Sequence, residues 1–283
     1  MKNIFRLFLV LSVLLFSKLN AQNSDTDTLP FDVSLNYSKT IIFYSEEVKD
    51  SFYIYIKLPK NYNQDPEEYY PALLLLDGDI AFPMAWSVVR YLQYGGHVPD
   101  IIIVGIGYGG LLKNDKPNRR ERDYSISDFN GTNQSGAAEI FLHFIKNELV
   151  PLLSYAYRID KTNMTLSGHS LGGLFVLYTF MKDPELFSNY ISSSPYTHYD
   201  LELLLALEEK KQNKNKDIKR RLFISNGANE DEKEYGNPIN QIVIRLKQSE
   251  SDNFKMNYKI FDDGTHFTTP AEALSYGLKF CFE

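Results

Sequence analysis

The sequence predicts a single α/β domain with a mostly parallel central sheet and helices on both of its faces. Segments with strand and helix patterns alternate along the chain, which is typical of parallel sheets. Two strand patterns, "PALLLLDGD" (71–79) and "DIIIVGIGYGG" (100–110), are short continuous apolar runs, as expected of strands buried on both faces. The chain has 283 residues, 43% of them hydrophobic, and is long enough for one such core.

The elements expected along the chain follow from local periodicity. The segment "SFYIYIKLP" alternates Tyr and Ile as a strand does, and Ile140, Phe141, Phe144, Ile145 and Leu149 form one stripe at helical spacing. Strands are expected at residues 39–46, 51–59, 71–79, 100–110, 164–168, 190–195, 220–227 and 255–263. Helices are expected at residues 81–94, 136–153, 171–181, from about 201, 238–249 and 270–280.

The N-terminal residues 1–21 have the pattern of a secretory signal peptide. Lys2 and Arg6 precede an apolar run from Leu7 to Phe16, and the small residue Ala21 follows. That run is shorter than the roughly 20 apolar residues that a membrane span needs. We therefore expect an exported protein, periplasmic or extracellular, with no membrane span in the mature chain. Residues 22–36 are expected to form a flexible arm, and residues 37–283 the folded domain.

The charge balance argues against a nucleic-acid partner. The full chain has a net charge of −6, and its first 21 residues contain three basic residues and no acidic one, so the mature chain would carry −9. A nucleic-acid-binding protein needs a basic face. The lone cysteine, Cys281, cannot form a disulfide within the chain.

The segment "LSGHSLGGLF" (166–175) contains a G-x-S-x-G motif between a predicted strand and a predicted helix. In that context the glycines allow a sharp turn that presents Ser170, and the backbone N–H of Leu171 points the same way to stabilise an oxyanion. The alternative is a glycine-rich turn without chemistry. A second amide donor is expected after the strand 71–76, from Asp79 or Gly78.

A serine needs a base, and the chain has five histidines. His266 lies between the last strand and the last helix, at the edge where the carboxyl ends of parallel strands converge. His169 is expected to face away from the serine, and His198 to line the rim of the pocket. The carboxylate that orients the base should follow the strand 220–227, where three candidates stand in a row: Glu230, Asp231 and Glu232.

The chain resembles the α/β-hydrolase esterases of the ferric-siderophore type (enterobactin and salmochelin esterases), within the esterase D-like group. The resemblance runs from about Ile42 to Phe282 through "YPALLLLDGD", "IIIVGIGY", "RERDYS", "GAAEIFLHFIKNELVPLLSYAYRID", "LSGHSLGGLFVLYTF", "YISSSP", "GTHF" and "ALSYGLKF". It implies an α/β-hydrolase catalytic domain in which Ser170 is the nucleophile and His266 the base. The family pattern Gly-x-x-Glu falls on Gly227 and Glu230 and implies Glu230 as the acid, with a Ser–His dyad as the alternative.

The resemblance also implies a substrate site and a reaction. Arg122 and Tyr124, in "RERDYS", are expected to contact an anionic substrate, unless Arg122 only pairs with Asp123 and braces its loop. The expected activity is that of a secreted serine carboxylesterase working through an acyl-enzyme, without metal or cofactor. Its partner would be a small-molecule ester, first of all a catecholate trilactone siderophore. The alternatives are an acetyl or feruloyl esterase acting on polysaccharide esters and a catalytically silent binding protein.

Overall fold

The computed structural model describes residues 34–110, 118–128, 131, 134–210 and 219–283, and the sheet belongs to a compact unit over Asn36–Glu283. The predicted signal peptide and most of the predicted arm lie outside the described residues. In the described part the chain forms an eight-stranded sheet in the order β1-β2-β4-β3-β5-β6-β7-β8. Its strands are β1 (Ser38–Ser45), β2 (Asp50–Lys57), β3 (Tyr70–Leu75), β4 (Ile102–Gly107), β5 (Ile159–His169), β6 (Asn189–Ser193), β7 (Arg220–Gly227) and β8 (Phe254–Phe261).

The helices lie between consecutive strands or, for the last one, after the final strand, and two short π-helical segments adjoin them. The α-helices are α2 (Gly78–Tyr94), α3 (Arg120–Tyr124), α4 (Ala138–His143), α5 (Val150–Ala156), α6 (Leu171–Lys182), α7 (Leu201–Lys210), α8 (Asn237–Gln248) and α9 (Pro270–Phe282). The π-helical segments are η1 (Phe144–Leu149) and η2 (Glu232–Gly236). Within the described residues, no helix combines the length and apolar character needed to cross a membrane.

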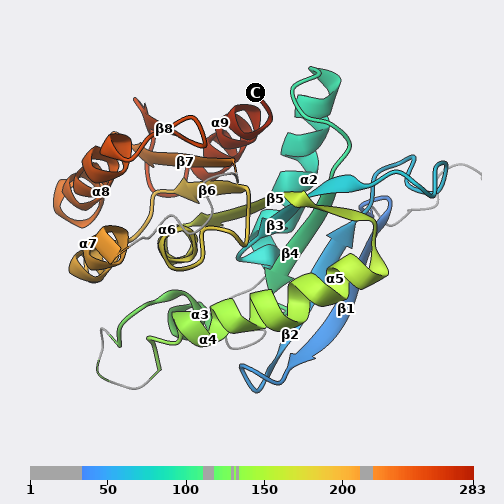
Figure 1. Ribbon diagram of the computed structural model, residues 1–283, viewed down its shortest axis with the longest axis horizontal. Coiled ribbons are helices and arrows are strands. Elements are labelled where there is room, and N and C mark those ends of the chain that lie inside the picture. The colour runs from blue at the N-terminus through green and yellow to red at the C-terminus, as the bar shows by residue number, and fades with distance from the viewer. Residues whose placement is uncertain (1–33, 111–117, 129–130, 132–133, 211–218) are drawn as a thin grey trace, which may run out of the picture. The chain divides into compact units, whose positions relative to one another are not determined.

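Helices cover the sheet on both faces (Figure 1). Helices α2 and α9 pack against each other and against the central strands from one side. Helix α6 packs on β5 and β6 from the other side, where α3, α4 and α7 contact it. Strands β1 and β2 are antiparallel, and every pair from β4 to β8 is parallel. This confirms the predicted α/β-hydrolase fold and places the carboxyl ends of β3, β5, β6 and β7 at one edge.

The predicted helix over residues 136–153 differs in detail from the observed one. Residues 138–156 form α4, η1 and α5 in succession, so a π-helical turn interrupts the α-helical repeat. Of the predicted apolar stripe, Phe141, Phe144, Ile145 and Leu149 are buried, whereas Ile140 is 46% exposed. Ala138 and Leu142 are buried as well. The buried stripe therefore includes Ala138 and Leu142 in addition to four of the five predicted residues, and Ile140 lies at its margin.

Aromatic side chains join this helix to the sheet and to α6. Phe141 lies 5.5 Å from Phe52 on β2 and 5.1 Å from Phe175 on α6, measured between ring centroids. Its ring is also 5.4 Å from Tyr124 on α3. All four side chains are fully buried. The α4 helix thus supports α3 and α6, which carry residues of the candidate site.

We expect Phe141→Ala to lower the free energy of unfolding by about 3–5 kcal/mol, because it leaves a cavity in this cluster. Tyr155→Ala, at a position 93% exposed on α5, is the matched control and should change it by no more than about 0.5 kcal/mol. Urea unfolding of both variants makes the comparison. Similar losses in the two would contradict the packing role of Phe141.

Candidate active site

Ser170 occupies a strained turn between β5 and α6. Its backbone has φ 61° and ψ −120°, and few residues other than glycine adopt a positive φ. The Ser170 amide donates to the carbonyl oxygen of Ser193 at 3.0 Å, and its own carbonyl accepts from the amides of Leu174 and Tyr196, each at 3.0 Å. Backbone hydrogen bonds from two neighbouring segments therefore hold the serine in this conformation.

The glycines around Ser170 make the turn possible. A Cβ atom on Gly168 would lie 2.4 Å from the carbonyl oxygen of Gly172, closer than any side chain can approach backbone. A Cβ atom on Gly173 would lie 2.8 Å from the carbonyl oxygen of Ser193. The strand and the helix on either side of the serine therefore pack backbone to backbone, as the motif predicts.

His266 and Glu230 form a hydrogen-bonded pair beside this turn. The Nδ1 atom of His266 lies 2.8 Å from Oε1 of Glu230, and the other carboxylate oxygen accepts from the amide of Gly227 at 3.0 Å. The Glu230 side chain is 1% exposed. Asp231 instead accepts from the amides of Lys233 and Glu234 and caps η2. Of the three candidate carboxylates, Glu230 contacts the histidine.

The environment keeps Glu230 ionised. Burial of the carboxylate acts to raise its pKa, but hydrogen bonds from His266, from the Gly227 amide and from the Ser194 hydroxyl outweigh burial and lower the pKa. A carboxylate that stays charged next to Nδ1 fixes which imidazole nitrogen carries the proton and stabilises a protonated ring.

The His266 ring lies between two other rings that border the serine turn. The ring of His169, the residue before Ser170, has its centroid 4.5 Å away, and that of Tyr235 is 4.6 Å away. The hydroxyl of Tyr235 lies 3.5 Å from Nε2 of His266. Burial, with the carboxylates of Glu230 and Glu234, raises the pKa of Tyr235 to about 12, against the effect of the Ser170 hydroxyl. Among the described residues no hydrogen bond joins Ser170 directly to His266.

Two helix N-termini meet beside the serine. Leu171 is the first residue of α6, and Gly78 and Asp79 are the first two of α2, so their amides are free of intrahelical bonds. A Cβ atom on Gly172 would lie 3.3 Å from Oδ2 of Asp77, which shows how close the two helix starts are. Both expected sources of amide donors are thus present at one place.

Arg120 bridges these two helix starts. Its Nε and Nη2 donate to the two carboxylate oxygens of Asp77 at 2.9 and 3.0 Å, and Nη2 also donates to the carbonyl oxygen of His169 at 3.2 Å. Asp77 has φ 52°, a left-handed conformation that is uncommon for aspartate, and its amide donates to the Tyr124 hydroxyl. The ion pair therefore ties the β3–α2 turn to the serine turn.

The Asp79 side chain has a role that the sequence did not predict. Its carboxylate is buried and accepts from the Tyr55 hydroxyl at 2.5 Å and from the amides of Tyr108 and Gly109 at 2.7 and 2.9 Å. These bonds hold the chain that leaves β4 against α2. The Asp79 amide remains at the helix N-terminus, as expected.

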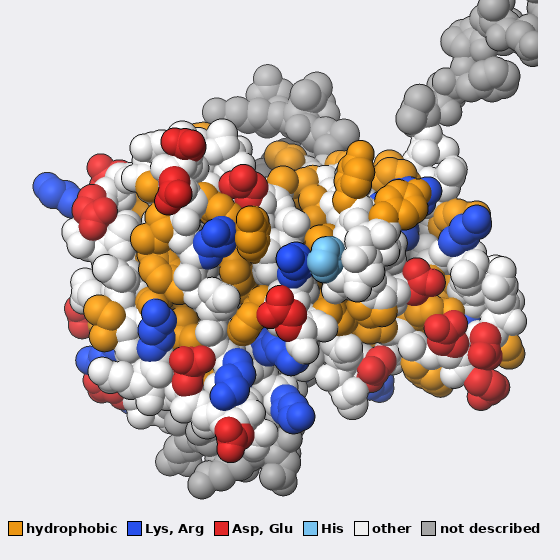
Figure 2. Space-filling model, turned by 90° about the horizontal axis from the view of Figure 1, so that it is seen from above, with side chains coloured by type: hydrophobic (Ala, Val, Ile, Leu, Met, Phe, Trp, Pro, Cys, Tyr) orange, Lys and Arg blue, Asp and Glu red, His pale blue; other side chains and the backbone are white. Residues whose placement is uncertain are grey.

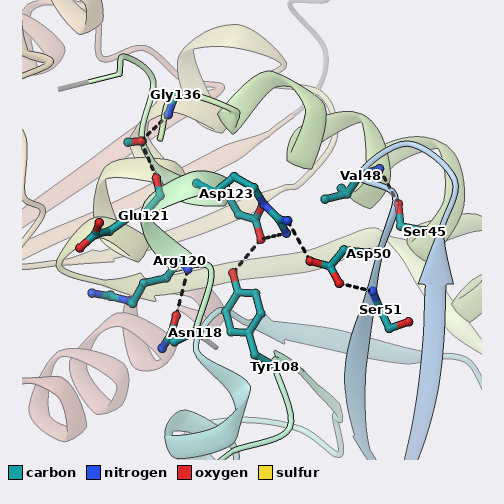
Figure 3. A network of polar contacts seen from close by, with 12 residues as sticks. Ser45, Val48, Asp50, Ser51, Tyr108, Asn118, Arg120, Glu121, Asp123 and Gly136 are labelled. Carbon is teal, nitrogen blue, oxygen red and sulfur yellow. Dashed lines mark hydrogen bonds and ion pairs between the residues drawn. The ribbon is translucent and has the colours of Figure 1, made fainter. Parts of the chain in front are cut away.

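The structure places the other predicted substrate residues differently from expectation. Arg122 donates to both carboxylate oxygens of Asp123 and to Asp50, so the bracing alternative describes its contacts. Asp123 also accepts from the Tyr108 hydroxyl at 2.9 Å, and Figure 3 shows that hydroxyl pointing toward Asp123. Tyr124 is fully buried and cannot contact a substrate in this structure, because it supports Asp77 from behind. His198 is exposed, with its ring 5.2 Å from that of Tyr199.

A cavity of about 570 Å³ lies between α2 and α9, at the ends of β3 and β5. His169, Asp79 and Arg120 are among its lining residues, and Arg122 is not. Sequence reasoning thus selected the wrong arginine of "RERDY" for the pocket and missed Tyr235. The only feature of the sequence that pointed to Arg120 was its place beside Arg122 in the segment 120–125, and no feature pointed to Tyr235.

Charged side chains do not gather into one basic surface on the face drawn in Figure 2. Lys and Arg alternate there with Asp and Glu, and hydrophobic side chains lie between them. Within the described residues, no group of three or more His, Cys, Asp or Glu is arranged to hold a metal ion.

Comparisons with known proteins agree with this geometry. A family model described as putative esterase matches residues 45–269. The ferri-bacillibactin esterase of Bacillus subtilis is 33% identical over 171 residues, which cover 55% of this chain and 57% of that protein. The chain spans about half the length of the curated relatives it matches.

Solved structures extend the likeness to most of the fold. The BES protein from Bacillus cereus aligns with a TM-score of 0.80 and 27% identity over 92% of this chain and 100% of the other. An IroE-like serine hydrolase from Shewanella oneidensis aligns with a TM-score of 0.74 and 26% identity, covering 87% and 80%.

The half-buried imidazole of His169 should make stability depend on pH. Burial, with nearby His266 and Arg120, lowers its pKa from 6.5 to about 4. Between these values the unfolded chain binds the proton and the folded one does not. The free energy of unfolding is therefore highest above about pH 6.5 and decreases as the pH falls toward 4, because protons bind preferentially to the unfolded chain.

Urea unfolding at pH 7 and 4.5 measures this effect. We expect the wild type to lose about 2 kcal/mol more on acidification than His169→Gln does. His143→Gln, at an exposed position on α4, should behave as the wild type does. An unchanged pH dependence in His169→Gln would show that this imidazole is not a source of acid sensitivity.

Proposed function

The chain belongs to the esterase family whose model matches residues 45–269, and we propose that it is a secreted serine esterase that cleaves siderophore esters. The observation that carries the mechanism is the buried Glu230–His266 pair next to the strained turn that presents Ser170. A hydroxyl, a carboxylate and an imidazole in this chain order are the parts of a catalytic triad on an α/β-hydrolase sheet.

Each group has one task in the proposed reaction. The Ser170 Oγ attacks the ester carbonyl while Nε2 of His266 takes its proton, and Glu230 stabilises the imidazolium through Nδ1. The imidazolium then protonates the leaving alcohol, which leaves an acyl group on Ser170. Water, deprotonated by the same imidazole, attacks the acyl-enzyme and releases the acid. The chemistry needs no cofactor.

The amides of Leu171 and Asp79 are proposed to hold the oxyanion that forms at each tetrahedral stage. Their helix N-termini face the same space, and the Arg120–Asp77 pair keeps the two turns together. Tyr235 lies next to both Ser170 and Nε2, so it positions these groups before the substrate arrives. Binding of an ester would bring the serine hydroxyl onto Nε2, since catalytic hydrogen bonds often tighten only in the complex.

The siderophore part of the proposal is supported by the relatives. The matched Bacillus subtilis protein is a ferri-bacillibactin esterase. The electrostatic support expected from Arg122 is absent, because two carboxylates already pair with it. Arg120 lies at the cavity, but Asp77 balances its charge. Export is proposed from the signal-peptide pattern of residues 1–21 alone.

We expect Ser170→Ala to reduce kcat by about 10⁶-fold, because the nucleophile is lost. Hydrolysis of a catecholate trilactone and of an aryl acetate measures the loss, and a fluorophosphonate should label the wild type and not the variant. Ser87→Ala, on the exposed face of α2, is the control and should keep full activity. Residual activity within tenfold of wild type would refute the mechanism. If the wild type cleaved a feruloyl ester faster than the trilactone, a feruloyl ester would replace the siderophore ester as the proposed substrate.

Glu230→Gln should lower kcat by about 10⁴-fold, because the amide cannot stabilise the imidazolium or fix its tautomer. Asp231→Asn is the matched control one residue away, where the side chain only caps η2, and should keep most of the activity. Steady-state hydrolysis of an aryl acetate gives both values. If Glu230→Gln works as well as the control, a Ser170–His266 dyad is sufficient.

A further inference from the structure

We propose that the protein binds a hydroxylated monocarboxylate, such as a sugar acid, in a second site at the edge of the sheet opposite the candidate active site. The site is a hollow of about 380 Å³ at the amino ends of β5, β6 and β7, bordered by the end of α9. Ser170 and Glu230 follow the opposite ends of β5 and β7, and β7 alone is roughly 20 Å long between Arg221 and Gly227. The inference is independent of the proposed esterase function.

Cations of β7 line the hollow without a partner. Arg221 is partly buried, and Lys219, directly before the strand, is exposed. Neither side chain makes an ion pair or a hydrogen bond with the described residues. Lys255 on β8 is the register partner of Arg221, so it adds a positive charge on the same face of the sheet. A guanidinium that is free in this way can bind a carboxylate through two parallel hydrogen bonds.

Neutral polar groups occupy the middle of the hollow, on and beside β6. Asn189 is only 3% exposed, and its Nδ2 donates to Oδ1 of Asn163 and to the hydroxyl of Ser188, each at 3.2 Å. The Nδ2 group of Asn163 is left free, because it donates to no residue in the described part of the chain. A fixed amide with free N–H groups can donate to the hydroxyl oxygens of a ligand.

Carboxylates border the hollow as well. Asp160 on β5 accepts through Oδ1 from the amide and the hydroxyl of Thr162, at 2.9 and 2.6 Å, and its Oδ2 has no partner among the described residues. Glu283, directly after α9, is the second lining carboxylate, and neither it nor Asp160 forms an ion pair with the cations of β7. A carboxylate oxygen can accept from a ligand hydroxyl, but it repels a second negative charge. The hollow therefore favours a monocarboxylate over a phosphate dianion.

The arrangement of these groups across the sheet defines the ligand. Strands β5 and β7 lie on either side of β6, so their backbones are about 10 Å apart. A ligand that spans this distance meets cations on β7, a neutral amide in the middle and a hydrogen-bond acceptor on β5. Of the described lining residues only Cys281 and Phe282 have apolar side chains, so an apolar ligand would gain little. A small molecule with a carboxylate at one end and hydroxyl groups along the rest satisfies all three parts.

Calorimetric titration of the full chain with glucuronate tests the proposal. We expect one molecule to bind per chain, and Arg221→Gln to weaken its binding by about tenfold or more, because the charge-assisted contact is lost. Arg90→Gln, at an exposed position on α2 outside the hollow, is the matched control and should bind as the wild type does. Glucose, which has hydroxyl groups but no carboxylate, should bind about tenfold more weakly than glucuronate, or weaker still.

A second variant separates loss of the site from loss of the fold. Lys219→Gln removes an exposed cation, so its urea unfolding should match that of the wild type while its affinity for glucuronate falls about threefold or more. Equal affinity in Arg221→Gln and Arg90→Gln, or glucose binding as tightly as glucuronate, would overturn the proposal. Tighter binding of inorganic phosphate than of glucuronate, or no saturable binding below about 10 mM, would overturn it too. Hydrolysis of an aryl acetate reports on the proposed esterase function separately, and Arg221→Gln should leave it unchanged.

Discussion

The left-handed backbone at Ser170 is the constraint on which the whole site depends. Such a conformation costs on the order of 1–3 kcal/mol in a residue other than glycine, so the surrounding structure has to impose it. Backbone hydrogen bonds to the end of β6 hold the serine in this conformation, and the absence of a side chain at Gly168 leaves room for it. The same turn places the Leu171 amide, the proposed oxyanion donor, and the His169 ring, which lines the cavity.

Electrostatic interactions at this edge of the sheet serve mainly to position loops. Asp77, Asp79 and Asp123 each bind a cation or several donors from a different segment, and together they connect β3, β4, α2 and α3. Partly buried ion pairs of this kind contribute little net stability because both partners lose hydration, but removing one partner is costly.

The alternation of apolar runs with turn residues predicted all eight strands and the longer helices, because buried parallel strands leave a strong local signal. It did not predict the short helix α3, which was expected to be a loop. Topology also placed Ser170, His266 and the loop of Glu230 at one edge. Other details depend on side-chain direction, which periodicity does not encode. Arg120 and Arg122 are two positions apart on a helix, so they point to different sides, and only tertiary contacts decide which one meets the cavity.

Helix α6 has no solvent-facing side before its last residue, since Leu171 to Met181 are all buried. Its amide protons should therefore be among the last in the domain to exchange with solvent, because exchange there requires the core to open. Glu230 and His266 belong instead to loops at the ends of β7 and β8, near one edge of the sheet. The proposed nucleophile thus stands at the start of an almost fully buried helix, whereas its proposed partners are carried by loops at the ends of strands.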